Sequence, residues 1–242
     1  MMTPSPTGLL LIDKPRGPTS MDVCRVVKRA LIAGGAPKKV KVGHGGTLDP
    51  LATGLLVVLI GRATRLCDSI MAGAKAYIAD IDLSAFTPTD DAEGEREPVE
   101  VASPPTRAQI DAALPRFTGT IMQRPPVFSA MKVDGQRAYK LARKGREVEL
   151  PPRPVRIDAL RVLGYEWPRL SLHIDCGKGT YIRSLARDLG TALGTGGHLA
   201  GLCRTRIGQF TIEHARTLDA LPAQLGQGDL LPVPTDPQGG AA

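Results

Sequence analysis

Residues 43–60 read GHGGTLDPLATGLLVVLI, and this stretch decides the organisation of the chain around it. It opens with closely spaced glycines, passes through an Asp-Pro dipeptide and ends in the apolar run 55–60. A run of this length is typical of a buried strand. Pro50 biases Asp49 toward an extended backbone, and the glycines before it allow a ligand to approach the main chain closely. The stretch therefore predicts a ligand-facing loop that leads into a core strand.

Asp49 is the first candidate for chemistry. It lies between Leu48 and Pro50, and a carboxylate with apolar neighbours costs free energy unless a partner compensates its charge. The plainer alternative is a turn-forming aspartate, because Asp-Pro dipeptides are common in turns. Spacing alone leaves both interpretations open.

Outward from this stretch, strands and helices follow one another without regular alternation, which favours an α+β fold over a doubly wound sheet. Short apolar or alternating runs predict strands at residues 9–12, 77–83, 160–165 and 170–176. Apolar residues at helical spacing predict helices capped by Thr19 or Ser20, over 108–114, and capped by Thr180. Residues 87–105, rich in proline and acidic residues, predict an exposed loop.

The positive charge of the chain is concentrated in one segment. The 242 residues carry 31 Lys and Arg against 24 Asp and Glu, a difference of +7, and 42% of them are hydrophobic, ample for a packed core. Between residues 124 and 156, nine basic and three acidic residues account for +6 of that charge. The segment is either a solvated basic face or a protruding element that binds phosphates.

Several function classes receive no support from the sequence. No run approaches the roughly 20 apolar residues of a membrane span, and residues 1–7 lack the regions of a signal peptide. The four cysteines and four histidines show no metal-ligand spacing. Residues 43–46 lack the Lys-Ser/Thr that would follow in a phosphate-binding Walker loop. We therefore expect a cytoplasmic protein with no metal and no cofactor.

Three further residues have both a structural and a functional interpretation. With Thr180 as N-cap, Arg183 falls at the third helical position, where the helix dipole disfavours a cation by up to about 1 kcal/mol. A partner anion would explain it; the alternative is an exposed, unpaired arginine. Tyr77 is either a core tyrosine or an aromatic wall for a stacked base. His44 is either a pocket residue or an exposed loop histidine.

Four ordered motifs together resemble the TruB family of tRNA pseudouridine-55 synthases, over roughly residues 9–221. They are KPRGPTS at 14–20, GHGGTLDPLATG at 43–54, PPVFSAMK at 125–132 and GKGTYIRSLARDLG at 177–190. The resemblance implies an α+β fold with a mixed, largely antiparallel sheet and flanking helices. It implies a catalytic domain over 8–221, with a basic thumb insertion at about 124–156, and composition predicts a flexible tail over 222–242.

The resemblance also implies roles for individual residues. Asp49 corresponds to the catalytic aspartate, Tyr77 to the aromatic residue beneath the flipped uracil, and Arg183 to the partner of Asp49. His44, Tyr181 and Leu202 correspond to positions that line the uridine pocket or help to open the T-loop. Contacts to the RNA backbone are expected from Lys14, Lys132, Arg137, Lys140, Arg143 and Lys144. The expected partner is the T-arm of tRNA, bound by a monomer that needs no membrane and no protein partner.

Three departures from the family pattern stand out. Phe128 replaces a frequent tyrosine, and Pro88 replaces a frequent aspartate. Members commonly carry a small C-terminal RNA-binding domain, for which we expect too little ordered chain after Leu221. Two other functions stay open: a non-catalytic RNA-binding or RNA-folding protein, and an N-glycoside hydrolase that releases uracil. A guide-RNA-dependent enzyme is disfavoured, because that class relies on the extra C-terminal domain.

Overall fold

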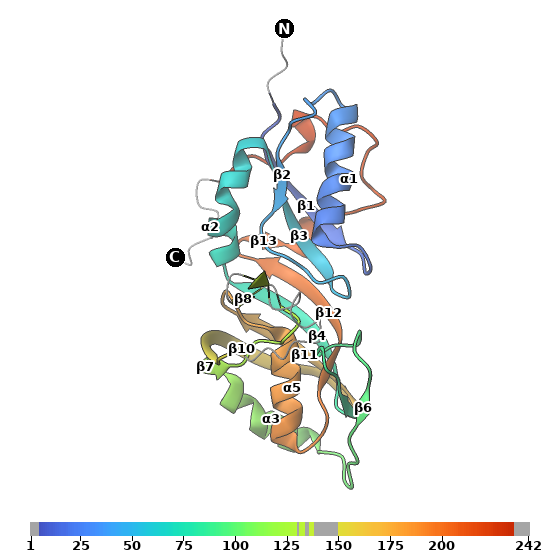
Figure 1. Cartoon of the computed structure of the whole chain (residues 1–242), viewed down its shortest axis with the longest axis vertical. Helices are drawn as coiled ribbons and strands as arrows, with labels where there is room; N and C mark the ends of the chain where they lie inside the picture. Colours follow the sequence, from blue (N-terminus) through green and yellow to red (C-terminus); the bar gives the residue numbers. More distant parts are fainter. Residues whose placement is uncertain (1–4, 130, 134–135, 138–149, 235–242) are drawn as a thin grey trace. The chain divides into compact units, whose positions relative to one another are not determined.

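The computed structural model describes residues 5–129, 131–133, 136–137 and 150–234 and divides the chain into two compact units. Unit 1 comprises the chain up to Tyr77 and again from Cys203, and unit 2 comprises the chain between them. The chain leaves unit 1 within strand β4 (Lys75–Asp82) and returns within strand β12 (His198–Ile207) (Figure 1). A single catalytic domain over 8–221 therefore stays a prediction.

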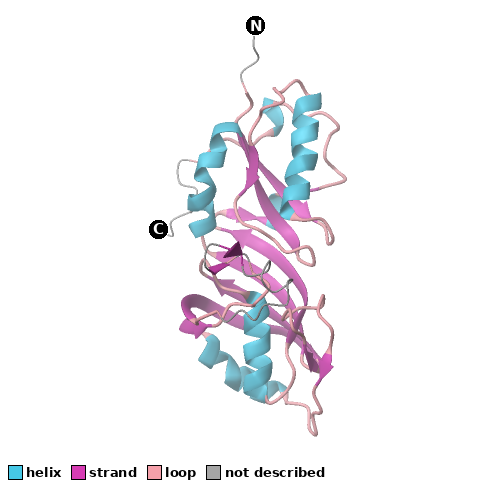
Figure 2. Ribbon diagram, in the orientation of Figure 1, coloured by secondary structure: helices cyan, strands magenta, loops and turns pink. Residues whose placement is uncertain are grey.

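Unit 1 is built on a mixed sheet whose strands follow the order β14-β1-β3-β12; Figure 2 draws strands in magenta and helices in cyan. Strand β1 (Gly8–Lys14) runs antiparallel to β3 (Thr53–Ile60) and parallel to β14 (Arg216–Thr217). Strand β12 runs parallel to β3. Two short strands, β2 (Val42–His44) and β13 (Phe210–Thr211), pair antiparallel with β3 and β12.

Residues 9–12 of β1 and 55–60 of β3 are all apolar because both faces of the sheet are covered. On one face they pack against α1 (Ser20–Ala33), and on the other against the 3-10 helix Gly61–Leu66 and α2 (Cys67–Ala72). Alternate residues therefore enter two different cores: Leu10, Ile12, Leu56, Val58 and Ile60 in one, and Leu9, Leu11, Leu55, Val57 and Leu59 in the other. This confirms the predicted buried strand.

Helix α1 begins with a capping box that decides between its two candidate N-caps. The Thr19 side chain accepts a hydrogen bond from the Asp22 amide at 3.1 Å, and the Asp22 carboxylate accepts one from the Thr19 amide at 3.0 Å. Thr19 is therefore the N-cap, which leaves the hydroxyl of Ser20 free to bond elsewhere.

The chain after Leu221, predicted to be a flexible tail, packs on unit 1 as far as Leu231. Leu225 and Leu230 are buried with the α1 core. Leu231 and Leu9 exchange two backbone hydrogen bonds of 2.8 and 3.0 Å. The prediction was wrong for this segment because the abundance of Pro, Gly and Gln conceals two leucines that complete the core.

In unit 2 the strand order is β12-β4-β11-β10-β7. Strand β10 (Arg153–Glu166) runs antiparallel to both β11 (Arg169–Cys176) and β7 (Gly119–Gln123). Helices α3 (Arg107–Ala113) and α5 (Ile182–Leu193) pack together, and the 3-10 helix Leu114–Phe117 extends α3 (Figure 1). The two units confirm the α+β class with a mixed, largely antiparallel sheet.

Two short hairpins complete unit 2. Strands β5 (Ala85–Phe86) and β6 (Glu97–Pro98) pair with each other, as do β8 (Lys132–Val133) and β9 (Gln136–Arg137). Residues 138–149 of the predicted thumb insertion lie outside the described residues.

Two local predictions in unit 2 were wrong. Helix α5 has Tyr181 as its N-cap, without a side-chain cap. The hydroxyl of Thr180 instead donates to the carbonyls of Gly177 at 3.2 Å and Arg156 at 3.3 Å. The acidic loop is also not exposed throughout, because Asp90 and Asp91 are buried. In both cases contacts with distant segments override the local pattern.

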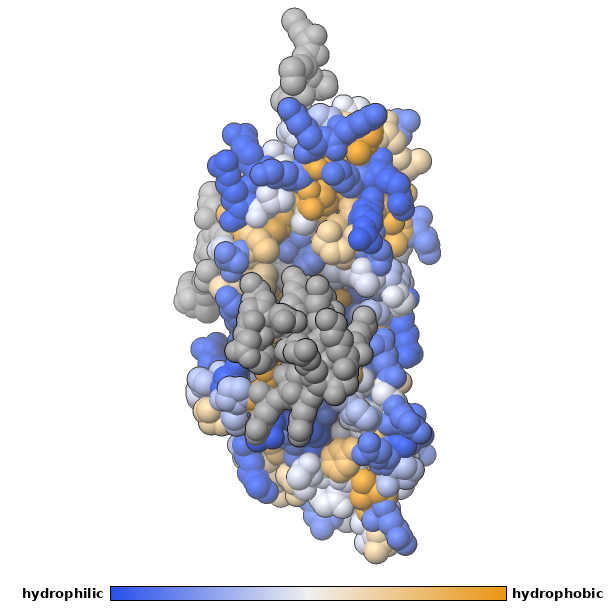
Figure 3. All heavy atoms as spheres, viewed as in Figure 1, coloured by the Kyte–Doolittle hydropathy of each residue, from blue (hydrophilic) through white to orange (hydrophobic). Residues whose placement is uncertain are grey.

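Hydrophilic side chains cover most of the coloured part of the face drawn in Figure 3, with apolar residues scattered among them. Among the large apolar side chains of the described residues, Met122 and Leu163 of unit 2 are the most exposed, at 64% and 54%. Within the described ranges, none of the helices has the length and apolar character needed to cross a membrane.

Candidate functional site

The loop that carries Asp49 connects β2 to β3 and is fixed on both sides by the first motif of the sequence. The Ser20 hydroxyl accepts from the Leu48 amide at 2.8 Å and lies 3.0 Å from the Leu48 carbonyl, to which it donates. On the other side, the Gly17 amide donates to the Pro50 carbonyl at 2.8 Å. Asp49 itself is half-buried, and its carbonyl accepts from the Ala52 amide at 3.1 Å. Asp49 therefore begins a turn that hydrogen bonds hold on both sides, and its catalytic role stays a prediction.

Lys14 is completely buried beside this loop, which contradicts its predicted contact with the RNA backbone. Its ammonium donates to the carbonyls of Pro15 and Pro18 at 2.9 Å each, and to that of Pro50 at 3.4 Å. These three acceptors use all three of its donors. Burial lowers the pKa of Lys14, while the charge of Asp49 acts in the opposite direction. Lys14 therefore holds the loop from inside.

Arg204 of β12 fixes the other end of the same loop. Its guanidinium donates to the carbonyls of Gly46 at 3.0 Å, Thr47 at 3.3 Å and Leu55 at 2.9 Å. The side chain is almost fully buried, at 2% exposure. Burial lowers its pKa, and a hydrogen bond and charge interaction with Tyr77 raise it. Arg204 thus links the turn before Asp49 to the Tyr77 hydroxyl.

A glycine allows β12 to come close enough for this contact. Gly54 has φ +96°, and a Cβ atom there would lie 2.4 Å from the carbonyl oxygen of Arg204. Such a distance excludes any side chain, because the obstacle is backbone. The glycine at this end of the 43–54 motif is thus required by the strand pairing.

Two predicted pocket residues lie in the surroundings of Arg204. The His44 imidazole, at the end of β2, is half-buried, and burial together with the nearby Arg204 charge lowers its pKa. Among the described residues its buried Nδ1 atom has no hydrogen-bond partner. Tyr77 is 9% exposed. The sequence motifs therefore bring Asp49, His44 and Tyr77 into one electrostatically connected region of unit 1.

In unit 2, Arg183 is buried at the start of α5 and forms an ion pair with Asp91, which the sequence did not predict. Its guanidinium donates to Asp91 at 3.2 Å, to the Thr89 carbonyl at 3.3 Å and to the Phe128 carbonyl at 3.0 Å. The Arg183 and Asp91 side chains are only 9% and 3% exposed. Its expected pairing with Asp49, which lies in unit 1, stays a prediction.

A second ion pair follows one helical turn later. Arg187 donates to Asp90 at 2.7 Å and to Asp188 at 2.9 Å. Burial raises the pKa of Asp90 to about 6, and the nearby arginines act against this rise. Asp90 has φ 59°, in the left-handed region that aspartate and asparagine tolerate best among non-glycine residues. The acidic loop is thus anchored to α5 by two consecutive carboxylates.

Tyr181 is held by two groups from the neighbouring sheet. The Gln123 side chain accepts from the Tyr181 amide at 2.9 Å and donates to its carbonyl at 3.1 Å. The Arg153 guanidinium lies 5.1 Å from the centre of the Tyr181 ring and donates to the Gly179 carbonyl at 2.7 Å. The Tyr181 ring therefore has a defined position before any RNA binds.

The remaining predicted residues are only partly described. Leu202 of β12 is half-buried. The backbones of Lys132 and Arg137 face each other in the β8–β9 hairpin, whereas Lys140, Arg143 and Lys144 lie outside the described residues. The described part of the chain contains no group of three His, Cys, Asp or Glu residues arranged to hold a metal ion.

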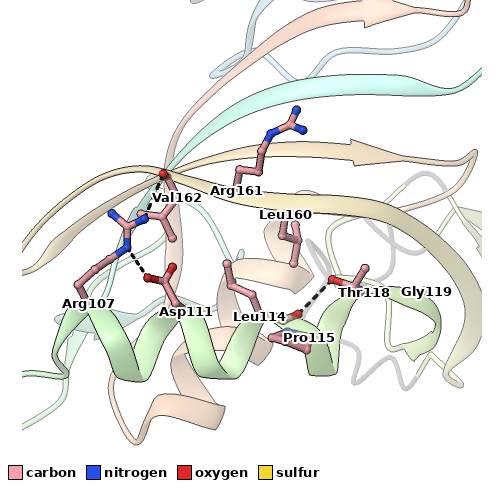
Figure 4. Close-up of a pocket in the computed structure, with 9 residues that line it drawn as sticks. All are labelled: Arg107, Asp111, Leu114, Pro115, Thr118, Gly119, Leu160, Arg161 and Val162. Carbon is pink, nitrogen blue, oxygen red and sulfur yellow. Dashed lines mark hydrogen bonds and ion pairs between the residues drawn. The ribbon is translucent and has the colours of Figure 1, made fainter.

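A groove in unit 2 lies apart from every predicted site residue. It runs between the α3 region and β10, with Leu114, Pro115 and Leu160 among its lining residues (Figure 4). Arg107 in this groove is paired with Asp111 at 2.9 Å, and Arg161 contacts His173 and Asp175 of β11. Its arginines are thus already paired.

Sequence reasoning missed Arg204, Gln123 and the anchoring roles of Ser20 and Asp91. Arg204 follows the recognised Leu202 by two positions in the same strand, but nothing in the local pattern distinguishes it from Arg206. Ser20 and Asp91 were noticed only as a possible cap and as part of an exposed loop. Their partners lie 28 and 92 residues away in the chain, so the local pattern could not identify them.

Comparison with known proteins identifies the family. Residues 34–182 match the profile described as "TruB family pseudouridylate synthase (N terminal domain)". Residues 183–229 match "tRNA pseudouridylate synthase B C-terminal domain". A C-terminal family domain is thus matched within the chain, beginning at Arg183 and running past Leu221.

Individual relatives agree with the profiles. The chain is 49% identical to "tRNA pseudouridine synthase B" of Mycobacteroides abscessus over 222 residues, covering 90% of this chain and 72% of the relative. It is 44% identical to the protein of the same name from Phocaeicola vulgatus, covering 92% and 94%. Among solved structures, a "Cbf5-Nop10-Gar1 Complex" matches at 31% identity and TM-score 0.67, over 88% of this chain and 52% of that one.

Proposed function

Because this chain belongs to the TruB family of pseudouridylate synthases, we propose that it isomerises one uridine in the T-loop of tRNA, at position 55, to pseudouridine. The observation that carries the proposal is the rigid Asp49 turn. Two buried cations and the Ser20 hydroxyl hold it in place, within a chain that matches the family over nearly its whole length. Such a turn presents a carboxylate in a fixed position.

The proposed reaction breaks the N1–C1′ bond, turns the detached uracil and joins C5 to C1′. The proton on C5 is released to solvent and N1 gains one, so the composition of the RNA is unchanged and nothing is oxidised. The uridine first leaves its stack, which costs a few kcal/mol. Asp49 then acts as nucleophile, at ribose C1′ or at uracil C6, or first removes a ribose proton; the sequence leaves these routes open. Its proposed partner is Arg183.

The other predicted residues have supporting roles in this proposal. Tyr77 stacks on the base and assists removal of the proton from C5. Leu202 excludes water, so that the cleaved base rejoins the ribose. His44 and Tyr181 line the uridine pocket, and the basic residues 124–156 contact phosphates of the T-arm. We propose that the protein does this as a cytoplasmic monomer without a protein partner.

The test is Asp49→Asn, assayed by tritium release from tRNA labelled at C5 of uridine. We expect the rate to fall by at least about 10³-fold, as when a nucleophile is lost, with the Kd for tRNA changed less than about threefold. Asp68→Asn, which alters an exposed acid of α2, is the control and should keep full activity. Appreciable turnover by the Asp49 variant would remove Asp49 from its role.

Product analysis separates the two other functions. A hydrolase would release free uracil, whereas the proposed isomerase leaves pseudouridine in the RNA. A non-catalytic RNA-binding protein would release no tritium even as wild type. A tRNA with cytidine in place of uridine 55 should also release none; release from it would place the target elsewhere.

A further inference from the structure

We propose that Arg204 is a positioning residue for the reaction, because its single guanidinium fixes both the turn that presents Asp49 and the hydroxyl of Tyr77. This inference rests on the proposed function. Arg204 lies outside the four sequence motifs. Arg204 itself touches neither base nor ribose in this role, and it acts through its two neighbours.

The hydrogen-bond geometry supports this role on the side of the loop. Each guanidinium nitrogen has its own backbone acceptor, at distances of 2.9 to 3.3 Å. Two of these acceptors, on Gly46 and Thr47, are successive carbonyls of the loop that leads to Asp49. A planar fork that binds successive carbonyls fixes the orientation of both peptide planes, which a lysine with one nitrogen cannot do in the same way.

The same side chain connects to the aromatic residue. The guanidinium hydrogen-bonds to the Tyr77 side chain as well. Tyr77 and Arg204 lie in β4 and β12, at the two points where the chain passes between its units. The position of the Tyr77 ring is thereby tied to the same group that sets the Asp49 turn.

Burying the Arg204 guanidinium costs solvation free energy, so stability alone does not explain why an arginine lies here. A guanidinium removed from water loses several kcal/mol of solvation free energy. Among the described residues, its hydrogen-bond partners are carbonyl groups and a phenol, none of which carries a full negative charge. A buried apolar side chain would avoid this cost but would leave three carbonyls without a donor. A charged fork is needed, however, to orient two carbonyls and a hydroxyl at once.

The experiment compares Arg204→Lys and Arg204→Met with wild type in single-turnover tritium release, tRNA binding and thermal unfolding. For Arg204→Met we expect the chemical rate constant to fall by about 10²-fold, the effect of a small misplacement of catalytic groups. The Kd should change less than about threefold. Arg204→Lys keeps the charge and one donor group, so it should recover part of the rate, to within about tenfold of wild type.

A double variant that also changes Tyr77 tests the positioning role directly. Its rate constant would show no coupling between the two residues if Arg204 were only structural. Arg204→Lys combined with Tyr77→Phe should lose much less than the product of the two single losses, because both changes disturb the same contact. Multiplicative losses, or an unchanged rate constant for Arg204→Lys and Arg204→Met, would overturn the proposal. If Arg204→Met does not fold, Arg204→Lys and the double variant decide.

Two controls separate this inference from the function on which it rests. Arg206→Lys makes the same chemical change two residues further along β12 and should leave the rate within about threefold of wild type. If Asp49→Asn retained activity, the proposed function would fail whatever the Arg204 variants do. If Asp49→Asn is inactive and Arg204→Met is fully active, only the positioning role fails.

Discussion

The two units bury cations in different ways. In unit 1, Lys14 and Arg204 donate to backbone carbonyls around the Asp49 turn. In unit 2, Arg183 and Arg187 at the start of α5 pair with the carboxylates of Asp91 and Asp90. Carbonyl acceptors do not titrate, whereas carboxylates do. The contacts of Lys14 and Arg204 therefore fix the path of the Asp49 loop. The attachment of the acidic loop to α5 instead depends on the charge of its carboxylates.

The largest effect is expected from Asp91→Ala in unit 2. Breaking a buried ion pair by removing one of its partners typically costs about 3–5 kcal/mol. Urea unfolding should show this loss. Asp111→Ala removes a pair whose side chains are about half exposed, at 49% and 50%, and should cost less than about 1 kcal/mol. Equal losses in both variants would mean that burial does not distinguish the Arg183–Asp91 pair.

Lys14→Met tests the corresponding arrangement in unit 1. The variant leaves three carbonyls without their donor, at about 1–3 kcal/mol for each unsatisfied buried group. It also removes a buried charge, so we expect a net loss of about 2–3 kcal/mol in urea unfolding. Lys39→Met, at an exposed position, is the control. If Lys14→Met were as stable as the control, the carbonyl contacts would not hold the loop.

The pH dependence of stability should differ between the units. The folded pKa of Asp90, about 6, lies above its ordinary 3.8. The folded state therefore binds this proton more tightly, and its contribution to the unfolding free energy decreases as pH rises from about 4 to about 6. Asp90→Asn keeps the left-handed backbone but cannot titrate. Its stability relative to wild type should rise over that range and then stay level.

The contribution of His44 in unit 1 to stability depends on pH in the opposite direction. Its folded pKa lies below the ordinary 6.5, so the unfolded state binds the proton more tightly. Its contribution to stability is complete above pH 6.5 and is lost as pH falls toward the folded pKa. His44→Gln should therefore become more stable relative to wild type as pH falls below about 6.5. Parallel slopes for the Asp90 and His44 variants would contradict the contrast between the units.

The smallest effect concerns the two helix starts. Thr19 caps α1 in a reciprocal box, and Thr19→Ala should cost about 1 kcal/mol. Thr180 precedes the uncapped α5 and makes only two hydrogen bonds longer than 3.1 Å, so Thr180→Ala should cost less than about 0.5 kcal/mol. Urea unfolding of the two variants checks the difference. A larger loss from Thr180→Ala would show that this hydroxyl stabilises the entry to α5 after all.

Local sequence patterns determined much of this protein. The apolar run 55–60 became a core strand because it is apolar on both faces, and Thr19 formed a cap with Asp22 three residues later. The glycine-rich approach to Asp49, the α+β class and the family resemblance were also readable. These features depend on neighbours within a few residues, or on ordered motifs, and a sequence displays both directly.

Tertiary structure alone decided which polar residues are buried and what they bind. Lys14 appeared to be an RNA contact and is enclosed by carbonyls, while Arg204, fully buried, looked no different from Arg206. Arg183 acquired Asp91 from a loop 92 residues away, and Arg204 reaches carbonyls 149 to 158 residues away. The cost of burying a charge depends on the groups that surround it after folding. No local pattern specifies those groups, because packing brings them from distant parts of the chain.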